Sequence, residues 1–75
     1  MKAFALISLR ECNEKEVIDK LMDLPEVEEA YIVFGEWDIL LKINIENPEA
    51  LGTFMIEKIR TLPEVKFTST MIVAK

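Results

Sequence analysis

The sequence predicts an α+β fold, in which a four-stranded antiparallel sheet carries two helices on one face. Apolar residues alternate along four segments, as in strands, and recur at helical spacing along two others. The chain also repeats itself, because residues 24–27 and 62–65 both read Leu-Pro-Glu-Val. Two βαβ units joined by a hairpin give the ferredoxin-like βαββαβ order. At 75 residues, we expect a single domain covering residues 1–75.

The first half begins with a strand over residues 2–9, which is apolar on both faces. Asn13 is a predicted helix N-cap with Glu16 as its capping-box partner. Pro25 ends this helix, and a second strand is predicted over residues 27–34. The apolar stripe of the helix consists of Val17, Ile18, Leu21 and Leu24.

Gly35 joins the second strand to a third over residues 37–45, and a residue free to adopt positive φ between two apolar runs indicates a hairpin. A second helix is predicted from the capping Asn47 to Pro63, followed by a last strand over residues 65–74. Gly52 inside this helix suggests a close approach by another backbone. The predicted buried stripe consists of Leu51, Phe54, Met55, Ile56, Ile59 and Leu62.

Composition excludes several classes of function. The net charge of −5 and nine scattered Lys and Arg residues argue against a direct nucleic-acid partner. With no histidine and one cysteine, Cys12, the chain offers no disulfide and no Cys/His metal site, and we expect no cofactor and no catalytic residue. No stretch approaches the ~18 apolar residues of a membrane span and no signal peptide is evident, so we expect a cytoplasmic protein without a membrane partner.

Helices on one face of the sheet leave the other face apolar and uncovered. An open patch of this kind is unusual in a soluble monomer, and a chain this short is rarely stable alone. We therefore predict that two chains pack sheet against sheet as a two-fold dimer, unless these residues are singly exposed. The predicted dimer interface consists of Phe4, Leu6, Tyr31, Val33, Leu40, Met71 and Val73.

Two places have side chains suited to a ligand. Asp38 follows the turn beside Trp37, where a carboxylate could hold an ammonium group while the backbone of Gly35 comes close. The last strand carries three hydroxyls in a row, at residues 68–70, that can donate and accept hydrogen bonds at a subunit edge. Each also has an ordinary structural explanation, as an acid in a hairpin turn and as residues common in strands.

The turn over residues 35–38, Gly-Glu-Trp-Asp, and the ending over residues 68–73, Thr-Ser-Thr-Met-Ile-Val, carry a resemblance to a known family. With the βαββαβ order and the repeated Leu-Pro-Glu-Val, the whole chain resembles the C-terminal domain of the Lrp/AsnC (feast/famine) transcriptional regulators. That domain is the regulation of amino-acid metabolism (RAM) domain. The first strand starts at Lys2, so the chain resembles the stand-alone members that lack a helix-turn-helix domain.

The resemblance implies dimers formed through the sheets, rings of dimers, and an amino-acid effector bound between dimers. Backbone amides and hydroxyls are implied to hold the α-carboxylate of the effector, and Asp38 its ammonium group. Phe67 stands where many relatives have Arg, so no polar contact is implied there. The implied effector-binding residues are Gly35, Glu36, Trp37, Asp38, Thr68, Ser69 and Thr70.

The leading hypothesis is therefore an effector-binding and oligomerisation module, not an enzyme. Such a module modulates transcription or amino-acid metabolism through protein assembly, with full-length Lrp/AsnC regulators as partners and without direct DNA binding. Two alternatives stay open: a small dimeric α+β-barrel enzyme that uses the space between helices and sheet, and a purely structural interaction module without effector binding.

Overall fold

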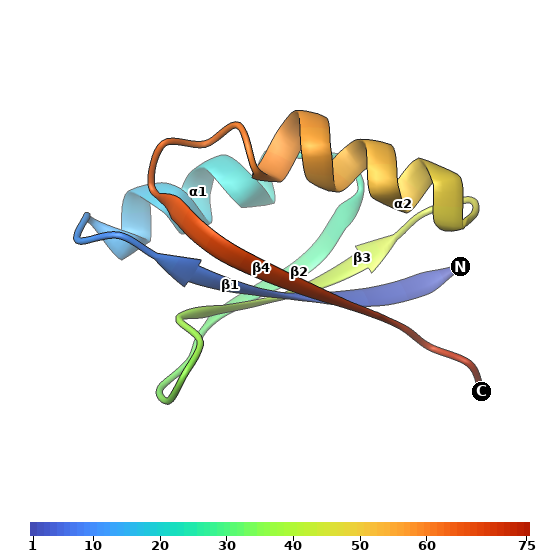
Figure 1. Ribbon diagram of the computed structural model, residues 1–75, viewed down its shortest axis with the longest axis horizontal. Helices are drawn as coiled ribbons and strands as arrows, with labels where there is room; N and C mark the ends of the chain where they lie inside the picture. Colours follow the sequence, from blue (N-terminus) through green and yellow to red (C-terminus); the bar gives the residue numbers. More distant parts are fainter.

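The computed structural model describes all 75 residues. The chain runs through β1 (Lys2–Leu9), α1 (Glu14–Met22), β2 (Val27–Ile32), β3 (Ile39–Asn44), α2 (Pro48–Phe54), the π-helical turn η1 (Met55–Ile59) and β4 (Val65–Ile72). Both helices lie on one face of a single sheet (Figure 1). The predicted ferredoxin-like α+β fold is confirmed.

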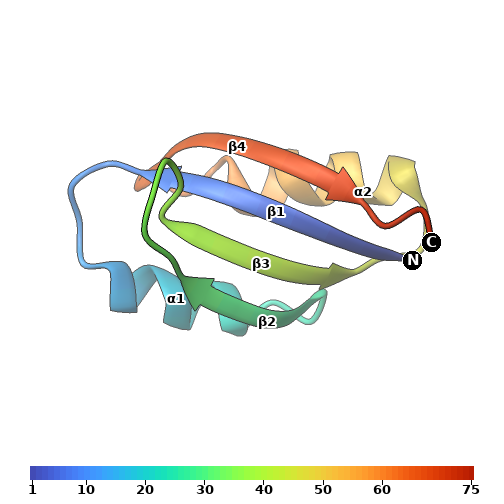
Figure 2. The same ribbon diagram turned by 90° about the horizontal axis from the view of Figure 1, so that it is seen from below.

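All strand pairs are antiparallel, and the strands lie in the order β2-β3-β1-β4. The strands β1 and β3 are therefore central, and β2 and β4 form the two edges. Seen from below, the sheet covers the helices and both chain ends lie at the same end of the molecule (Figure 2). Ala5 illustrates the register, because it pairs with Leu41 on β3 and with Thr70 on β4.

The core lies between the sheet and the helices. Side chains at alternate positions of the two central strands are fully buried: Ala3, Ala5, Ile7, Ile39, Leu41 and Ile43. The helical side of the core consists of Val17, Leu21, Leu51, Phe54, Met55 and Ile59. Ile56 was predicted to join this stripe, but it is 60% exposed. Three consecutive side chains point in different directions around a helix, so burying Phe54 and Met55 leaves Ile56 outside.

Both predicted N-cap residues are confirmed, but the predicted capping box is not, because the Glu16 carboxylate accepts no hydrogen bond from Asn13 N–H. The Asn13 side chain accepts hydrogen bonds from the backbone N–H groups of Lys15 (3.1 Å) and Glu16 (3.3 Å). The Asn47 side chain accepts one from Ala50 at 2.7 Å. Each cap satisfies backbone donors that the first turn of a helix leaves unpaired.

The repeated Leu-Pro-Glu-Val segments form the same turn in both halves. Val27 N–H donates to the carbonyl of Leu24 at 3.1 Å, and Val65 N–H donates to the carbonyl of Leu62 at 3.1 Å. The sequence repeat thus corresponds to a repeat in backbone geometry. Each segment ends a helix and directs the chain into an edge strand.

The connection between β2 and β3 is a longer loop than the predicted turn. Pairing stops at Ile32, and Phe34, which was predicted to lie in the strand, is fully exposed at 103%. The loop is closed where Val33 N–H donates to the carbonyl of Asp38 at 2.9 Å. Gly35 has a φ of +133°, so the predicted positive φ is confirmed. The loop stands away from the sheet on the side opposite the helices (Figure 1).

Two further expectations from the sequence are corrected. Strand β4 ends at Ile72 rather than at residue 74, because β1 begins at Lys2, whose carbonyl already accepts from Val73 N–H at 3.0 Å. A methyl group added at Gly52 would meet no heavy atom within 4 Å. The predicted close approach of another backbone to Gly52 is therefore wrong within this chain.

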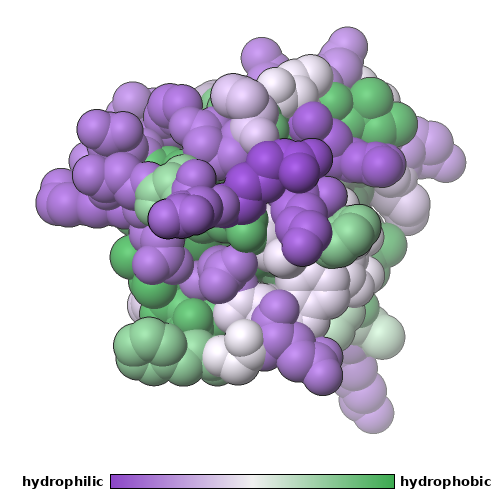
Figure 3. All heavy atoms as spheres, turned by 60° about the vertical axis from the view of Figure 1, so that its left-hand side comes forward, coloured by the Kyte–Doolittle hydropathy of each residue, from purple (hydrophilic) through white to green (hydrophobic).

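The face of the sheet opposite the helices carries the residues that were predicted to form a dimer interface. Phe4, Leu6, Val33 and Leu40 are half-buried, whereas Tyr31, Met71 and Val73 are 48%, 49% and 39% exposed. We call these seven residues the open apolar face. In Figure 3, apolar side chains lie at the lower left, beneath a band of hydrophilic residues, and a second apolar group lies at the upper right. No helix of the chain is long and apolar enough to cross a membrane.

Candidate functional site

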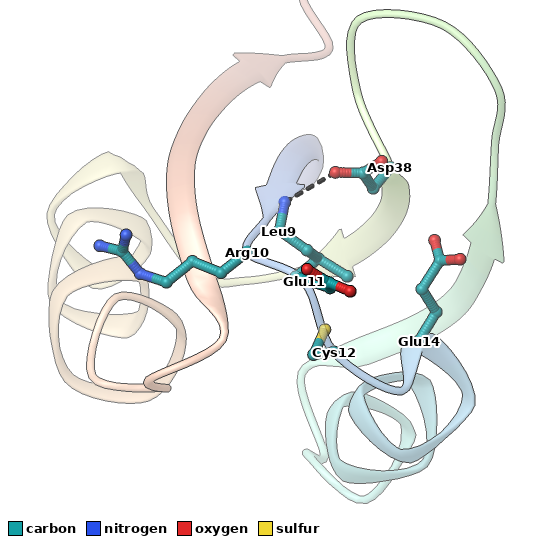
Figure 4. Close-up of a pocket in the computed structure, with 6 residues that line it drawn as sticks. All are labelled: Leu9, Arg10, Glu11, Cys12, Glu14 and Asp38. Carbon is teal, nitrogen blue, oxygen red and sulfur yellow. Dashed lines mark hydrogen bonds between the residues drawn. The ribbon is translucent and has the colours of Figure 1, made fainter.

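Asp38 is fixed at the end of the loop by three hydrogen bonds. Its backbone N–H donates to the carbonyl of Ile7 at 2.9 Å, and its carbonyl accepts from Val33. Its carboxylate oxygen Oδ2 accepts from the backbone N–H of Leu9 at 2.7 Å (Figure 4). Asp38 thus binds the last turn of the loop to the end of β1, and its second carboxylate oxygen makes no hydrogen bond within the chain.

Asp38 lines a small hollow with acidic walls. The hollow measures about 290 Å³, and its walls come from the connector after β1, the start of α1 and Asp38 itself; they contain three carboxylates and one cation, Arg10. Glu11 and Glu14 add two carboxylates near that of Asp38, and Figure 4 shows the side chains of Asp38 and Glu14 on the same side of the connector. A concentration of carboxylates favours a cationic ligand group, such as an ammonium. We call this site the acidic hollow.

Cys12 also lines the acidic hollow. Burial raises the pKa of its thiol, and the carboxylates of Glu64, Glu14 and Asp38 raise it further. A raised pKa keeps the thiol protonated and unreactive, because the thiolate is the nucleophile. No group of three or more side chains is arranged to hold a metal ion.

The three hydroxyls of β4 do not share one face of the sheet. Thr68 pairs with Ile7 and Thr70 with Ala5, so both lie on the helix side of the sheet. Ser69 pairs with Leu6 and lies on the opposite side, beside the open apolar face. No hydrogen bond to the chain engages any of the three side chains, which leaves them free for other partners.

Within one chain, the loop and the hydroxyls are not brought together. Asp38 and Thr68 flank Ile7 from the two neighbouring strands, two strand spacings or roughly 10 Å apart. Gly35 and Glu36 are exposed at the loop tip and Trp37 is half-buried outside the core. A ligand that touches both groups must therefore be large, or it must lie between chains.

The sequence did not reveal what surrounds Asp38. Leu9, Arg10 and Glu11 lie 29 to 27 positions before Asp38 in the chain, and no local pattern marks that contact. The strand register is the missing information, since it places the end of β1 beside the end of the loop. Also unpredicted were a basic hollow at the start of β4 and an apolar hollow of about 450 Å³ between α2 and β4.

Comparison with known proteins adds an independent observation. A family model described as "Lrp/AsnC ligand binding domain" matches residues 2–75. The HTH-type transcriptional regulator FL11 of Pyrococcus horikoshii is 37% identical over 75 residues, which are 100% of this chain and 49% of FL11. The crystal structure of FFRP-DM1 is 44% identical, with a TM-score of 0.90 and 96% of each chain covered.

A more distant structure shares the fold. A transcriptional regulator from Neisseria meningitidis, solved as a complex with L-methionine, is 22% identical with a TM-score of 0.90, covering 99% of this chain and 49% of the regulator. The chain spans about half the length, or less, of the curated relatives that it matches. Those relatives are transcriptional regulators and not enzymes, which removes the barrel-enzyme alternative.

Proposed function

Because the chain belongs to the Lrp/AsnC ligand-binding domain family, we propose that it binds an amino-acid effector and couples this binding to its assembly with other chains. Family membership makes it a regulatory effector-binding module. The amino acid as ligand, the assembly and the regulators with which it assembles are the proposal. The observation that supports it most directly is the free carboxylate oxygen of Asp38 in the acidic hollow.

The acidic hollow is suited to the ammonium end of an amino acid. Asp38 uses one carboxylate oxygen for Leu9 N–H and keeps the other for a ligand, so a bound ammonium would not have to break the loop anchor. Glu11 and Glu14 strengthen the negative potential there. The regulator from N. meningitidis was solved with L-methionine, which supports an amino acid as the class of ligand.

We propose that the carboxylate end is held by a different chain. The hydroxyls of Thr68, Ser69 and Thr70 lie two strands away from Asp38 and have no partner in their own chain. The loop that ends at Asp38 projects from the sheet, so it is accessible to a neighbouring molecule (Figure 1). A ligand held between chains stabilises the assembled state by mass action, which suffices for regulation without catalysis.

The open apolar face is the proposed surface of dimerisation. Beside this face, Lys42 and Glu29 form an ion pair at 3.5 Å. The other carboxylate oxygen of Glu29 accepts a hydrogen bond from the Tyr31 hydroxyl at 2.8 Å. The hydrogen bond from Tyr31, with the nearby Lys42, holds the pKa of Glu29 below its ordinary value. Charges paired in this way are less costly to bury than isolated ones.

A ligand screen tests the effector proposal. Each of the twenty amino acids is added at millimolar concentration while the melting temperature and the molar mass of the particle are measured. A ligand at 100 times its Kd stabilises the folded state by about 2.7 kcal/mol, which is several degrees in melting temperature for a domain of this size. If no amino acid shifts either quantity, the effector proposal is wrong and the purely structural module becomes the better explanation.

A charge-removing variant then locates the site. Asp38→Asn keeps an oxygen that can accept from Leu9 N–H but removes the negative charge, so we expect at least a tenfold weaker response to the amino acid. Asp23→Asn is the matched control, because Asp23 is exposed at the end of α1 and its side chain makes no hydrogen bond or ion pair. An unchanged response of Asp38→Asn would place the ligand elsewhere.

A further inference from the structure

A basic hollow lies at the start of β4. Arg10, Arg60, Lys66 and Thr68 line it together with Val65 and Phe67, and its volume is about 380 Å³. Three of the nine basic residues thus meet at one place in a chain whose net charge is −5. The ion pairs of the chain all use other cations, so these three have no counter-charge within 4.0 Å. Unpaired cations gathered in an acidic protein indicate an anionic ligand.

The three cations come from different elements, and the backbone fixes where each begins. Arg10 follows β1, and its backbone N–H donates to the carbonyl of Glu64 at 2.8 Å. Its side chain extends to the opposite side of the connector from Asp38 and Glu14 (Figure 4). Arg60 ends the π-helical turn, where its N–H donates to the carbonyl of Met55 at 2.8 Å. Arg10 thus borders both hollows but directs its guanidinium group away from Asp38 and Glu14. The basic hollow collects cations from the first half of the fold, at Arg10, and from the second half, at Arg60 and Lys66.

Lys66 is placed by a β-bulge. Ser8 pairs with Phe67 and Leu9 pairs with Val65, so Lys66 is the extra residue on β4. Bulges redirect side chains at sheet edges, and β4 is an edge strand. The Lys66 ammonium lies 5.4 Å from the centroid of the Phe67 ring, a cation–π distance that holds it near the hollow.

The internal repeat supplies a comparison within the same molecule. The first half has a register shift at the equivalent place, between Val27 and Glu29, where the extra residue is Glu28. Glu28 aligns with Lys66, and Met22 aligns with Arg60. The fold thus forms the same bulge without cations in its first half. The basic charges are therefore not a requirement of the architecture.

The polar groups of the side chains that line the hollow match one kind of ligand. Guanidinium and ammonium groups only donate hydrogen bonds, and no carboxylate is among the lining residues. Thr68 adds a hydroxyl. Successive backbone N–H groups of a strand point alternately to its two sides, and Val73 N–H points to β1. Thr68 N–H, five residues earlier, therefore points to the free edge of β4. Guanidinium groups suit the geometry of phosphate oxygens. We propose that this hollow binds a phosphate-type oxyanion, either free phosphate or the phosphate of a nucleotide.

Titration with inorganic phosphate tests the proposal on the intact chain without any amino acid, so its result is independent of the effector proposal. Sodium phosphate is compared with sodium chloride at equal ionic strength, and backbone amide signals are followed by NMR. We expect saturable shifts at Arg10, Arg60, Lys66 and Thr68 with phosphate only. A repeat with adenosine monophosphate separates the two sources of the group, since a nucleotide site saturates at a lower concentration than phosphate alone.

Two variants of equal charge make the test specific. Arg60→Ala removes a lining cation and should weaken phosphate binding about tenfold or more. Lys58→Ala removes the same charge from the same helical segment, outside the hollow, and should leave binding unchanged. Lys66→Met is a second lining variant, and melting curves without phosphate check that each variant folds. Equal losses in Arg60→Ala and Lys58→Ala, or the absence of saturation in the wild type, would overturn the proposal.

Discussion

Asp38 has a structural role that complicates any test of its binding role. Its carboxylate is the acceptor for Leu9 N–H in a partly buried position, so removing the carboxylate leaves a backbone donor unpaired. An unpaired buried donor costs about 1–3 kcal/mol. Asp38→Ala is therefore expected to lower the free energy of unfolding by about that amount, whereas Asp38→Asn, which retains an acceptor, should lower it much less.

Urea unfolding of the two Asp38 variants beside the wild type, at neutral pH and without ligand, measures this difference. Equal destabilisation by both variants would mean that charge, and not the hydrogen bond to Leu9, is what the fold requires. The sequence placed Asp38 in a hairpin but could not show this contact, because the hydrogen bond joins residues 29 positions apart.

The acidic hollow gives Cys12 a testable reactivity. Because burial and the neighbouring carboxylates raise the pKa of the thiol, less thiolate is present at a given pH than in an unfolded chain. We expect native Cys12 to react with neutral iodoacetamide more slowly than the same chain in urea, at pH 8. Glu14→Gln should speed the native reaction. If the native and the unfolded chain react at equal rates, the neighbouring carboxylates do not control the reactivity of the Cys12 thiol.

At the scale of elements, the two glycines should respond in opposite ways to the same change. Gly35 adopts a φ of +133° in the loop, which an alanine adopts only with strain, although space for a methyl group is open there. Gly52 is exposed within α2, and a methyl group meets nothing within 4 Å. We expect Gly35→Ala to destabilise by about 1–3 kcal/mol and Gly52→Ala to stabilise by up to about 1 kcal/mol.

Thermal unfolding of both glycine variants, at one protein concentration, provides the check. A destabilising Gly52→Ala would indicate that another chain approaches this helix in the assembled state, since nothing within the chain does so.

The link between α1 and the turn before β4 should make stability fall in acid. Lys20 lies 2.8 Å from Glu64, and the hydrogen bond from Lys20 holds the pKa of Glu64 below its ordinary value. With its pKa lowered in the folded state, Glu64 binds fewer protons there than in the unfolded chain, so its stabilisation is lost as pH falls below about 4. In Glu64→Gln, the free energy of unfolding should fall less between pH 5 and pH 3 than in the wild type, as measured by chemical unfolding. Glu57→Gln, on the exposed side of η1, is the control and should behave as the wild type. An equal pH dependence of the two variants would contradict the role of Glu64.

Local patterns were sufficient for most elements and insufficient for the sites. Caps, prolines and the repeat depend on residues close in sequence, so Asn13, Asn47 and the two Leu-Pro-Glu-Val turns were predictable. The bulge at Lys66, the exposure of Phe34 and the meeting of Arg10 with Arg60 depend on strand register and on which strand is an edge. The periodicity of apolar residues carries no information about strand register or about which strand is an edge. The hollows could therefore be identified only from the structure.

For the whole molecule, the main question is what covers the open apolar face. The fold uses one side of its sheet for the core and leaves Tyr31 and Met71 about half exposed on the other, while 51% of the chain is hydrophobic. A second copy is the partner with an equally apolar surface, and two-fold packing would bring each open apolar face against the other. The loop before β3 projects on the same side of the sheet, where it would reach the second chain (Figure 1).

Two methionines with equal exposure allow a direct test of this dimer. Met71 is 49% exposed on the open apolar face, and Met22 is 47% exposed at the end of α1, on the helix side. Met71→Lys puts two like charges into the proposed interface, one from each chain, and their desolvation should raise the dimer dissociation constant at least tenfold. Met22→Lys makes the same chemical change outside the interface and should leave the constant as in the wild type.

Sedimentation equilibrium over a range of protein concentrations measures both variants. A wild-type monomer, or an unchanged dimer of Met71→Lys, would mean that the open apolar face is not a self-association surface.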